Sequence, residues 1–291
     1  MSGGISAQYG FLYQRKVFLL KLLENMGSGK VLVFEGVDDI DIEQEDSIFG
    51  ITEAKRFIQV KSGTVGKKSF AKIIGNWLIN EDFYKEYSYK YTIIAEHDFS
   101  FDIYNIDFQN EIRDIYVSQK DAKSSSICKK VYDKYIDIIY KDDFLNMLFD
   151  IISSVDIDVL TMQELEKQIP DIYNNIYCTD IVNFEIAKQK RYEHFEQYIF
   201  HDIDEDIKAK RKCVIDYIKF YNHTVKCRDE VSDSEYKVNY KVFKKTKKKI
   251  EKRKLPQYFY NFFQFFSKGL SISENCIFYY LLNIPLFLLV L

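Results

Sequence analysis

Six segments in the first hundred residues alternate between helical and strand patterns, and their order constrains the fold more than any other feature. Two segments carry apolar residues at helical spacing, and four are short apolar or period-two runs typical of strands. In chain order they read helix, three strands, helix, strand, at residues 8–26, 30–35, 37–43, 51–61, 69–87 and 91–95. We therefore expect the N-terminal part to be an α/β domain with this element order.

Polar side chains gather toward the ends of the three predicted consecutive strands. They are, in chain order, Glu35, Asp39, Asp41, Gln59 and Lys61. Side chains two residues apart face the same side of a strand, so Asp39 and Asp41 share a face. For the same reason Gln59 and Lys61 share a face. Burying such groups is unfavourable unless each has a partner, and a bound cation supplies one.

These residue types in this arrangement favour metal-dependent cleavage of a phosphodiester. Mg²⁺ takes oxygen ligands, polarises a phosphoryl oxygen and lowers the pKa of a bound water. A neighbouring lysine stabilises the negative charge that develops on the phosphate. Mg²⁺ or Mn²⁺ is therefore the expected cofactor, with Asp39, Gln59 and Asp41 as candidate ligands. The spacing does not choose between Asp39 and Asp41 as the principal ligand.

Gln14 is a polar residue within the apolar face of the first predicted helix. It shares that face with Phe11, Val17 and Phe18, which lie three or four residues away. A glutamine in such a place needs hydrogen-bond partners. Two interpretations stay open: Gln14 reaches the pocket at the strand ends, or it bonds to backbone within the core.

A second acid-x-lysine pattern, formed by Glu53 and Lys55, begins the third strand. Lys55 and Lys61 are about 20 Å apart along an extended strand, so both cannot serve one site. We favour Gln59 and Lys61, because they end the strand and lead into a glycine turn, where functional groups tend to gather. Glu53 and Lys55 are expected to form a charged edge.

Three stretches of the N-terminal part resemble a known protein family. They are ISAQYGFLYQ at residues 5–14, FEGVDDIDI at 34–42 and FIQVKSG at 57–63. They resemble the double-stranded DNA endonuclease domain of bacterial anti-phage effectors, both those associated with cyclic-oligonucleotide signalling enzymes (CD-NTases) and those of multi-component defence systems with an ATPase partner. That domain belongs to the PD-(D/E)xK, or restriction-endonuclease-like, superfamily, whose core has the element order given above. The resemblance covers about residues 3–97.

The resemblance implies roles for five residues and an activity. Asp39, Gln59 and Lys61 would form the metal-binding and catalytic triad, and Glu35 and Gln14 would support it. Gln59 stands where the superfamily motif has Glu or Asp, as in the Mrr-like branch, which removes one charge from the metal site. The implied activity is that of a Mg²⁺-dependent endodeoxyribonuclease, a hydrolase of antiviral defence that acts on double-stranded DNA. One site per chain favours a homo-oligomer for cutting both strands, and protein partners of a multi-component defence system are expected as well.

The chain beyond about residue 100 has a mainly helical pattern. Apolar positions recur at helical spacing in residues 104–152 and 179–212, and Thr161 with Glu164 fits a capping box. Short strands are predicted at residues 213–221 and 235–243. We therefore expect a nuclease-like domain, a mainly helical partner-binding or assembly domain, and an apolar tail, at residues 3–100, 101–275 and 276–291.

Composition limits the partners and the compartment. The net charge of −3 means that a nucleic-acid surface must be a local patch, and Lys67, Lys68 and the run 241–254 are candidates. Five scattered cysteines without C-x-x-C spacing fit a reducing cytoplasm, and the N-terminus lacks a secretory signal pattern. The apolar tail contains Pro285 and is shorter than the roughly 20 residues that span a bilayer. We expect a buried terminal element, with a membrane tail as the alternative.

The same residues leave open a second interpretation, in which the protein belongs to a different functional class. A non-catalytic subunit could keep the nuclease-like fold only as a scaffold or as a DNA-binding module of a defence complex. Gln59 in place of an acid, together with the acidic overall charge, favours this alternative.

Overall fold

A computed structural model of the chain describes most residues up to 231. The described residues are 3–26, 30–36, 38–44, 55–80, 89–103, 105, 107–179, 181 and 185–231. They fall into two compact units. The first unit comprises Met1–Tyr173 and Tyr198–Phe220, and the second comprises Asn174–Gln197 and Tyr221–Leu291.

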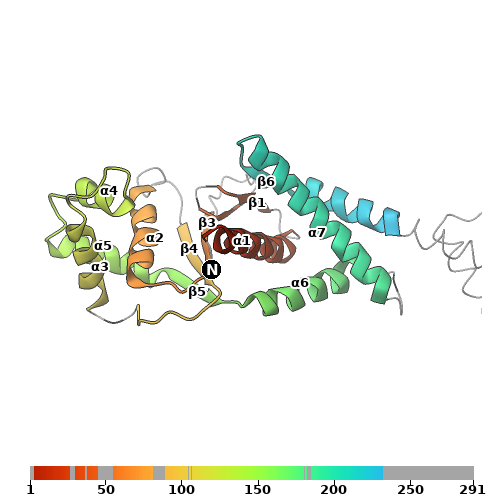
Figure 1. Cartoon of the computed structure of the whole chain (residues 1–291), viewed down its shortest axis with the longest axis horizontal. Helices are drawn as coiled ribbons and strands as arrows, with labels where there is room; N and C mark the ends of the chain where they lie inside the picture. Colours follow the sequence, from red (N-terminus) through yellow and green to blue (C-terminus); the bar gives the residue numbers. More distant parts are fainter. Residues whose placement is uncertain are drawn as a thin grey trace, which may run out of the picture. The chain divides into compact units, whose positions relative to one another are not determined.

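A six-stranded sheet runs through the first unit (Figure 1). Its strands are β1 (Lys30–Phe34), β2 (Ile40–Gln44), β3 (Lys55–Lys61), β4 (Tyr89–Ala95), β5 (Val155–Val159) and β6 (Cys213–Ile215). The strand order is β5-β4-β3-β2-β1-β6. β3, β4 and β5 pair in parallel, whereas β6, β1, β2 and β3 pair antiparallel. The fold is therefore mixed α/β.

Helices precede, interrupt and follow this sheet. They are α1 (Gly3–Asn25), α2 (Lys67–Asn80), α3 (Phe108–Ser118), α4 (Ile127–Lys134), α5 (Asp142–Ser153), α6 (Met162–Tyr177) and α7 (Glu185–Lys208), and residues 217–231 are also helical. The first elements follow the order α1, β1, β2, β3, α2, β4, which confirms the predicted succession of helix, three strands, helix and strand.

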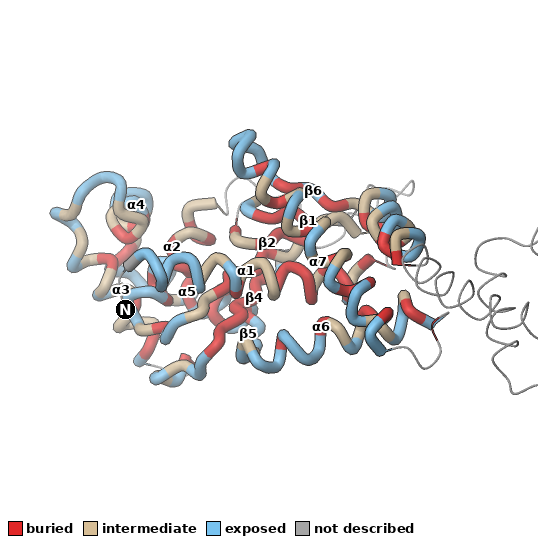
Figure 2. The backbone as a smooth tube through the Cα atoms, turned by 45° about the vertical axis from the view of Figure 1, so that its right-hand side comes forward, coloured by how far each residue is buried: buried red, intermediate tan, exposed pale blue. Residues whose placement is uncertain are grey.

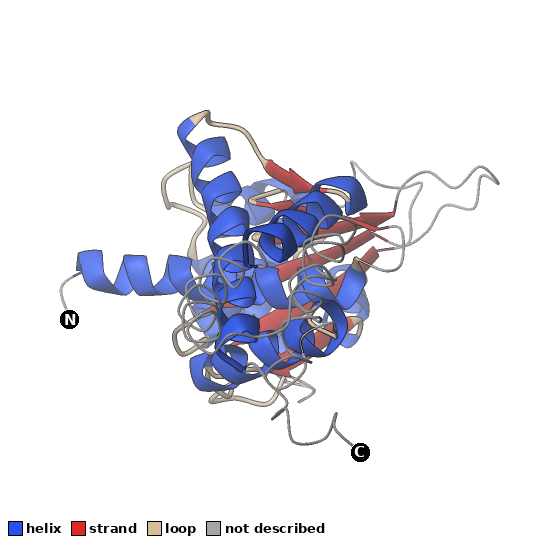
Figure 3. Cartoon of the chain, turned by 90° about the vertical axis from the view of Figure 1, so that its right-hand side faces the viewer, coloured by secondary structure: helices blue, strands red, loops and turns tan. Residues whose placement is uncertain are grey.

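Helix α1 packs against β1 through aromatic residues. The ring of Phe34 on β1 makes edge-on contacts with Phe11 and Phe18, at centroid distances of 5.8 and 5.3 Å. The second half of α1 is buried, whereas residues 4–9 are exposed, and Figure 3 shows these first turns projecting beyond the other elements. Burial is concentrated on the strands and on the middle of α1 (Figure 2). The helix is therefore held by its C-terminal half.

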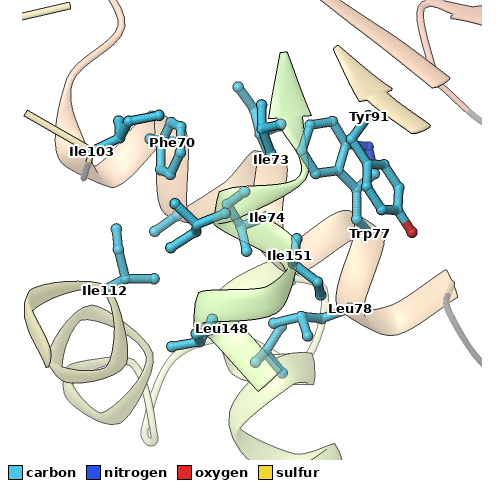
Figure 4. Packing of buried hydrophobic residues seen from close by; sticks show 14 of the residues in the cluster. Phe70, Ile73, Ile74, Trp77, Leu78, Tyr91, Ile103, Ile112, Leu148 and Ile151 are labelled. Atoms are coloured by element: carbon cyan, nitrogen blue, oxygen red, sulfur yellow. The ribbon is translucent and has the colours of Figure 1, made fainter. Parts of the chain in front are cut away.

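A large apolar cluster joins α2 to α3, α4 and α5 (Figure 4). It includes Trp77 of α2, whose ring stacks on Tyr91 of β4 at 4.5 Å, and Leu148 of α5, which is fully buried. Gly75 allows a close approach of α2 to α4, because a Cβ there would lie 3.1 Å from side-chain atoms of Ile127 and Val131. The cluster runs from residue 57 to residue 155, so the packing does not break at the predicted boundary near residue 100.

The predicted elements of the C-terminal part are confirmed in some places and wrong in others. The capping box is confirmed, because the Glu164 N–H donates to Thr161 Oγ1 at 3.2 Å and the Thr161 N–H donates to Glu164 Oε2 at 2.7 Å. The strand predicted for residues 213–221 is too long. It ends at Ile215 because Asp216 accepts the Lys219 N–H at 2.7 Å and so caps the helix at 217–231.

Some predictions concern segments that the structure does not describe. These are the strand at 235–243, the basic run at 241–254 and the apolar tail at 276–291. Among the helices that the structure describes, none combines the length and hydropathy of a bilayer-spanning segment.

We predict that Leu148→Ala lowers the free energy of unfolding by about 2–5 kcal/mol, because it leaves a cavity in the apolar cluster. The neighbouring Phe149 is 54% exposed, and Phe149→Ala serves as a control with an expected change of about 0.5 kcal/mol or less. Denaturant unfolding followed by circular dichroism measures both. Equal effects of the two substitutions would contradict the packing of α5 described above.

Candidate active site at one end of the sheet

The strand register brings the predicted site residues to one end of the sheet. In the antiparallel pair of β2 and β3, Asp41 lies opposite Phe57 and Ile40 lies opposite Ile58. One step further along the same register, Asp39 comes opposite Gln59. The end of β1, the start of β2 and the end of β3 therefore meet at this end.

Asp39 is the centre of the contacts there. Its Oδ2 accepts hydrogen bonds from Gln59 Nε2 and from the Val60 N–H, the latter at 2.7 Å. The ammonium of Lys61 lies 3.9 Å from the same oxygen, and its side chain is 36% exposed. The structure therefore brings together Asp39, Gln59 and Lys61.

Glu35 joins this group from the end of β1. Its backbone has a φ of 55°, in the left-handed region, and its N–H donates to the Asp39 carbonyl at 2.9 Å. Partial burial raises the pKa of the Glu35 carboxyl, the charge of Asp39 raises it further, and Lys61 lowers it. The Glu35 carboxylate therefore lies within the electrostatic field of both residues.

Asp41 shares a face with Asp39 but has a different environment. It is 2% exposed, and its Oδ1 accepts the Asp38 N–H at 3.1 Å. A Cβ on Gly36 would overlap its Oδ2, so the turn between β1 and β2 closes over this carboxylate only with glycine at that position. Of the two candidate ligands, Asp39 is therefore the one whose carboxylate contacts Gln59.

Asp38 is a buried acid that the sequence analysis missed. It is 7% exposed, and the indole N–H of Trp77 donates to its Oδ2. Burial raises its pKa to about 6; the Trp77 hydrogen bond opposes the rise, and the charges of Asp39 and Asp41 add to it. The signal in the sequence was the Asp-Asp pair directly before β2, because adjacent side chains in an extended segment point in different directions and only one of the two can face the site.

Glu96 is a second acid missed from the sequence. It directly follows β4 and is 8% exposed, its N–H donates to the Lys61 carbonyl at 2.9 Å, and its Oε1 accepts a hydrogen bond from the Tyr9 hydroxyl of α1. This hydrogen bond raises the pKa of Tyr9 to about 12, with a smaller effect of burial. Because β3 and β4 are parallel, an acid at the end of β4 had to come beside Lys61.

Gln14 and Lys55 do not join the group. Gln14 is half-buried on α1, and within the described residues its side chain has no hydrogen bond to Asp39, Gln59 or Lys61. Its supporting role stays a prediction. Lys55 lies at the opposite end of β3, where its ammonium pairs with Glu43 at 3.0 Å. The two lysines therefore belong to different ends of one strand.

The residues at this end can be compared with what a divalent cation requires. Among the described residues, no group of three or more His, Cys, Asp or Glu side chains is placed to hold a metal. Mg²⁺, however, is often held by one or two carboxylates and otherwise by waters and substrate phosphates. Asp39 and Glu35 supply two carboxylates whose mutual repulsion a cation would relieve, and Gln59 supplies an amide oxygen. The residues therefore fit a hydrated Mg²⁺ or Mn²⁺.

The chain shows only limited similarity to known proteins. No protein family matches the chain, and no curated protein matches it. Among solved structures, the chain is similar to the Acinetobacter baumannii Cap4 SAVED/CARF-domain containing receptor with the cyclic trinucleotide 2'3'3'-cAAA. The two share 12% sequence identity with a TM-score of 0.48, and the match covers 76% of this chain and 45% of that one. The Moraxella osloensis Cap4 SAVED/CARF-domain containing receptor gives 13% identity and a TM-score of 0.45, with 75% and 48% covered. The chain spans about half the length of these structures, and its function is argued from its own site.

We predict that the fluorescence of Trp77, the single tryptophan of the chain, titrates with a midpoint near pH 6 in metal-free buffer. The pKa of the Asp38 carboxyl is about 6 in the folded chain against an ordinary 3.8, so the folded state binds more protons between these values. Stability therefore falls as pH rises from about 4 to 6, by up to about 3 kcal/mol.

Asp38→Asn is the matched variant, because its amide oxygen still accepts the indole N–H. We expect it to remove both the fluorescence transition and this part of the pH dependence of unfolding. A transition that persists unchanged in Asp38→Asn would assign the titration to another group.

Proposed function

We propose that the N-terminal part of this chain is a metal-dependent endonuclease of the PD-(D/E)xK, or restriction-endonuclease-like, type that hydrolyses phosphodiester bonds in double-stranded DNA. The observation that carries the proposal is the convergence of Gln59 and Lys61 on the carboxylate of Asp39. The order of helix, three strands, helix and strand supports it, as does the resemblance noted in the sequence. The role in anti-phage defence, a cytoplasmic location and protein partners rest on that resemblance and on composition.

Asp39, Glu35 and the amide oxygen of Gln59 would hold the cation. A bound Mg²⁺ or Mn²⁺ supplies a polarised phosphoryl oxygen and a water of lowered pKa. Asp39 receives the Val60 N–H at 2.7 Å, which fixes the carboxylate against the end of β3. The Glu35 N–H donates to the Asp39 carbonyl, which holds the end of β1 next to Asp39.

Lys61 contributes a positive charge on the solvent side of Asp39. Its ammonium is 3.9 Å from the carboxylate, a loose ion pair that leaves donors free toward a phosphate. A lysine so placed stabilises the negative charge of the transition state and orients the attacking water. The Lys61 carbonyl accepts the Glu96 N–H, which holds the end of β3 beside β4.

Gln59 explains how the site is held together without a cation. Its amide is 8% exposed and donates to Asp39, whereas a glutamate there would add a second buried negative charge next to Asp39. The neutral side chain therefore adds no repulsion to Asp39, and it attracts a cation less strongly than a glutamate would. We expect weak cation binding, with the substrate phosphate completing the coordination.

A non-catalytic scaffold or DNA-binding subunit is the second candidate. The observation that favours it is that Asp39 Oδ2 already has three partners from the protein, and the described residues hold no cluster of three metal-binding side chains. In that case the same contacts would only brace the end of the sheet.

Cleavage of supercoiled plasmid with Mg²⁺ or Mn²⁺ tests the activity. We predict that Lys61→Ala lowers the rate by about 10²-fold or more, because it removes the charge next to the reacting phosphate. Lys55→Ala removes an equal charge from the other end of β3 and is expected to cleave like the wild type. Similar losses in both variants would contradict the placement of the site.

Binding of Mn²⁺ distinguishes the two candidate functions, nuclease and scaffold. Calorimetry on the full chain measures this binding. We predict that the wild type binds Mn²⁺ and that Asp39→Ala abolishes binding, because it removes the central carboxylate. Asp156→Ala, on β5, is a control that removes one acid elsewhere in the sheet. A wild type that neither binds Mn²⁺ nor cleaves DNA would favour the scaffold.

A further inference from the structure

A basic turn before β6 lies at the same end of the sheet as the candidate active site. β6 pairs antiparallel with β1, and the register ends with Phe34 opposite Cys213. Glu35 follows Phe34, and Lys212 precedes Cys213, so both leave the sheet at this end. The basic turn is exposed and contains Lys208, Lys210, Arg211 and Lys212.

Ion pairs neutralise only part of this charge. The four acids at the end of α7 each have a cationic partner, namely Asp202 with Lys219, Asp204 with Arg15, Glu205 with Lys208, and Asp206 with Arg211. Within the part of the chain that the structure describes, Lys210 and Lys212 have no acidic partner. These two lysines therefore remain as excess positive charge facing solvent.

The backbone of the basic turn is unusual at Lys210. Lys210 lies in the turn two residues after the end of α7 and has a φ of 55°, a conformation that favours glycine, and its N–H donates to the Ile207 carbonyl at 2.9 Å. Glu35 has the same φ, and the two are the non-glycine residues with positive φ among those described. A charged side chain thus occupies a glycine-favouring position just after β1 and again in the turn that leads into the adjacent strand β6, which points to a role for the side chains themselves.

We propose that Lys210 and Lys212 bind backbone phosphates of double-stranded DNA beside the bond that is cleaved. The proposal rests on the proposed function, because it takes the nuclease substrate as its ligand. Neighbouring strands are about 5 Å apart, so three strand spacings from β6 to β3 put the basic turn about 15 Å from Lys61. A duplex carries one charge per about 1.7 Å of its axis, so a duplex lying across this end reaches both places.

A further lysine, on the other side of Lys61 from the basic turn, also suits a DNA duplex as the ligand. Lys68, in the first turn of α2, is exposed and has no acidic partner among the described residues, whereas Lys67 is paired with Glu111 at 2.5 Å. Lys68 lies at the start of the crossover from β3 to β4, whereas the basic turn precedes β6, on the other side of β3 in the strand order, so the two lie on different sides of Lys61 along the sheet. A long polyanion that passes across the site matches this arrangement better than an acidic segment of a protein bound at one side.

The test measures binding of a fluorescein-labelled DNA duplex to the full chain by anisotropy, in EDTA, over a series of salt concentrations. The test variant combines Lys210→Gly, which keeps the left-handed backbone, with Lys212→Ala. The control combines Lys120→Ala with Lys123→Ala, which removes the same charge from an exposed turn after α3. A third variant, Lys210→Arg with Lys212→Arg, keeps the charge.

Loss of two phosphate contacts reduces the slope of log affinity against log salt by about 2 and weakens binding about 10-fold near physiological salt. We expect this change in the test variant alone, with wild-type binding in the control and in the arginine variant. A test variant that binds like the wild type, while the wild type binds the duplex and cleaves it in Mg²⁺, overturns the inference and leaves the proposed function intact. Equal losses in test and control variants overturn it as well. A wild type that neither binds nor cleaves the duplex overturns both.

Discussion

Three aspartates within four residues impose the constraint on which the candidate site depends. Like charges at this separation repel, so each carboxylate of Asp38, Asp39 and Asp41 needs donors of its own. Asp38 is bonded to Trp77 of the apolar cluster, and Asp41 is bonded to the backbone of the turn. Asp39 alone is left to contact Gln59. The Asp39 carboxylate therefore owes its position to two buried neighbours and, through Trp77, to the packing of α2.

Local periodicity was sufficient to predict that polar side chains of the second and third strands meet at one end of the sheet, whereas the choice of Asp39 over Asp41 came from the resemblance. Period two places Asp39, Gln59 and Lys61 on one face, and antiparallel pairing of the second and third strands brings their ends together. The capping box of Thr161 and Glu164 was predictable for the same reason, because its hydrogen bonds join residues three apart in the chain. Patterns of this kind need no knowledge of distant segments.

The burial of each side chain and the pairing of segments far apart in the sequence could not be predicted from local periodicity. Asp39 and Asp41 share a face, yet only the close approach of Gly36 shows that Asp41 is enclosed. The position of Asp38 depends on a tryptophan of α2, and that of Glu96 depends on the parallel pairing of β3 and β4, so both positions are set by segments far apart in the sequence. The cluster that spans residue 100 and the three-residue strand β6 likewise depend on contacts between segments far apart in sequence.

The pairing of β6 with β1 has a consequence for shortened forms of this chain. A chain that stops before Cys213 keeps Asp39, Gln59 and Lys61, but it presents β1 as an open edge with unpaired backbone donors and acceptors from Leu32 to Phe34. Such an edge is a template for the same edge of another molecule, because β1 is apolar and its backbone groups would be unpaired. A fragment that ends near residue 97, where the resemblance ends, would then tend to self-associate edge to edge, and its solubility would depend on β6, a strand that supplies none of the residues grouped around Asp39.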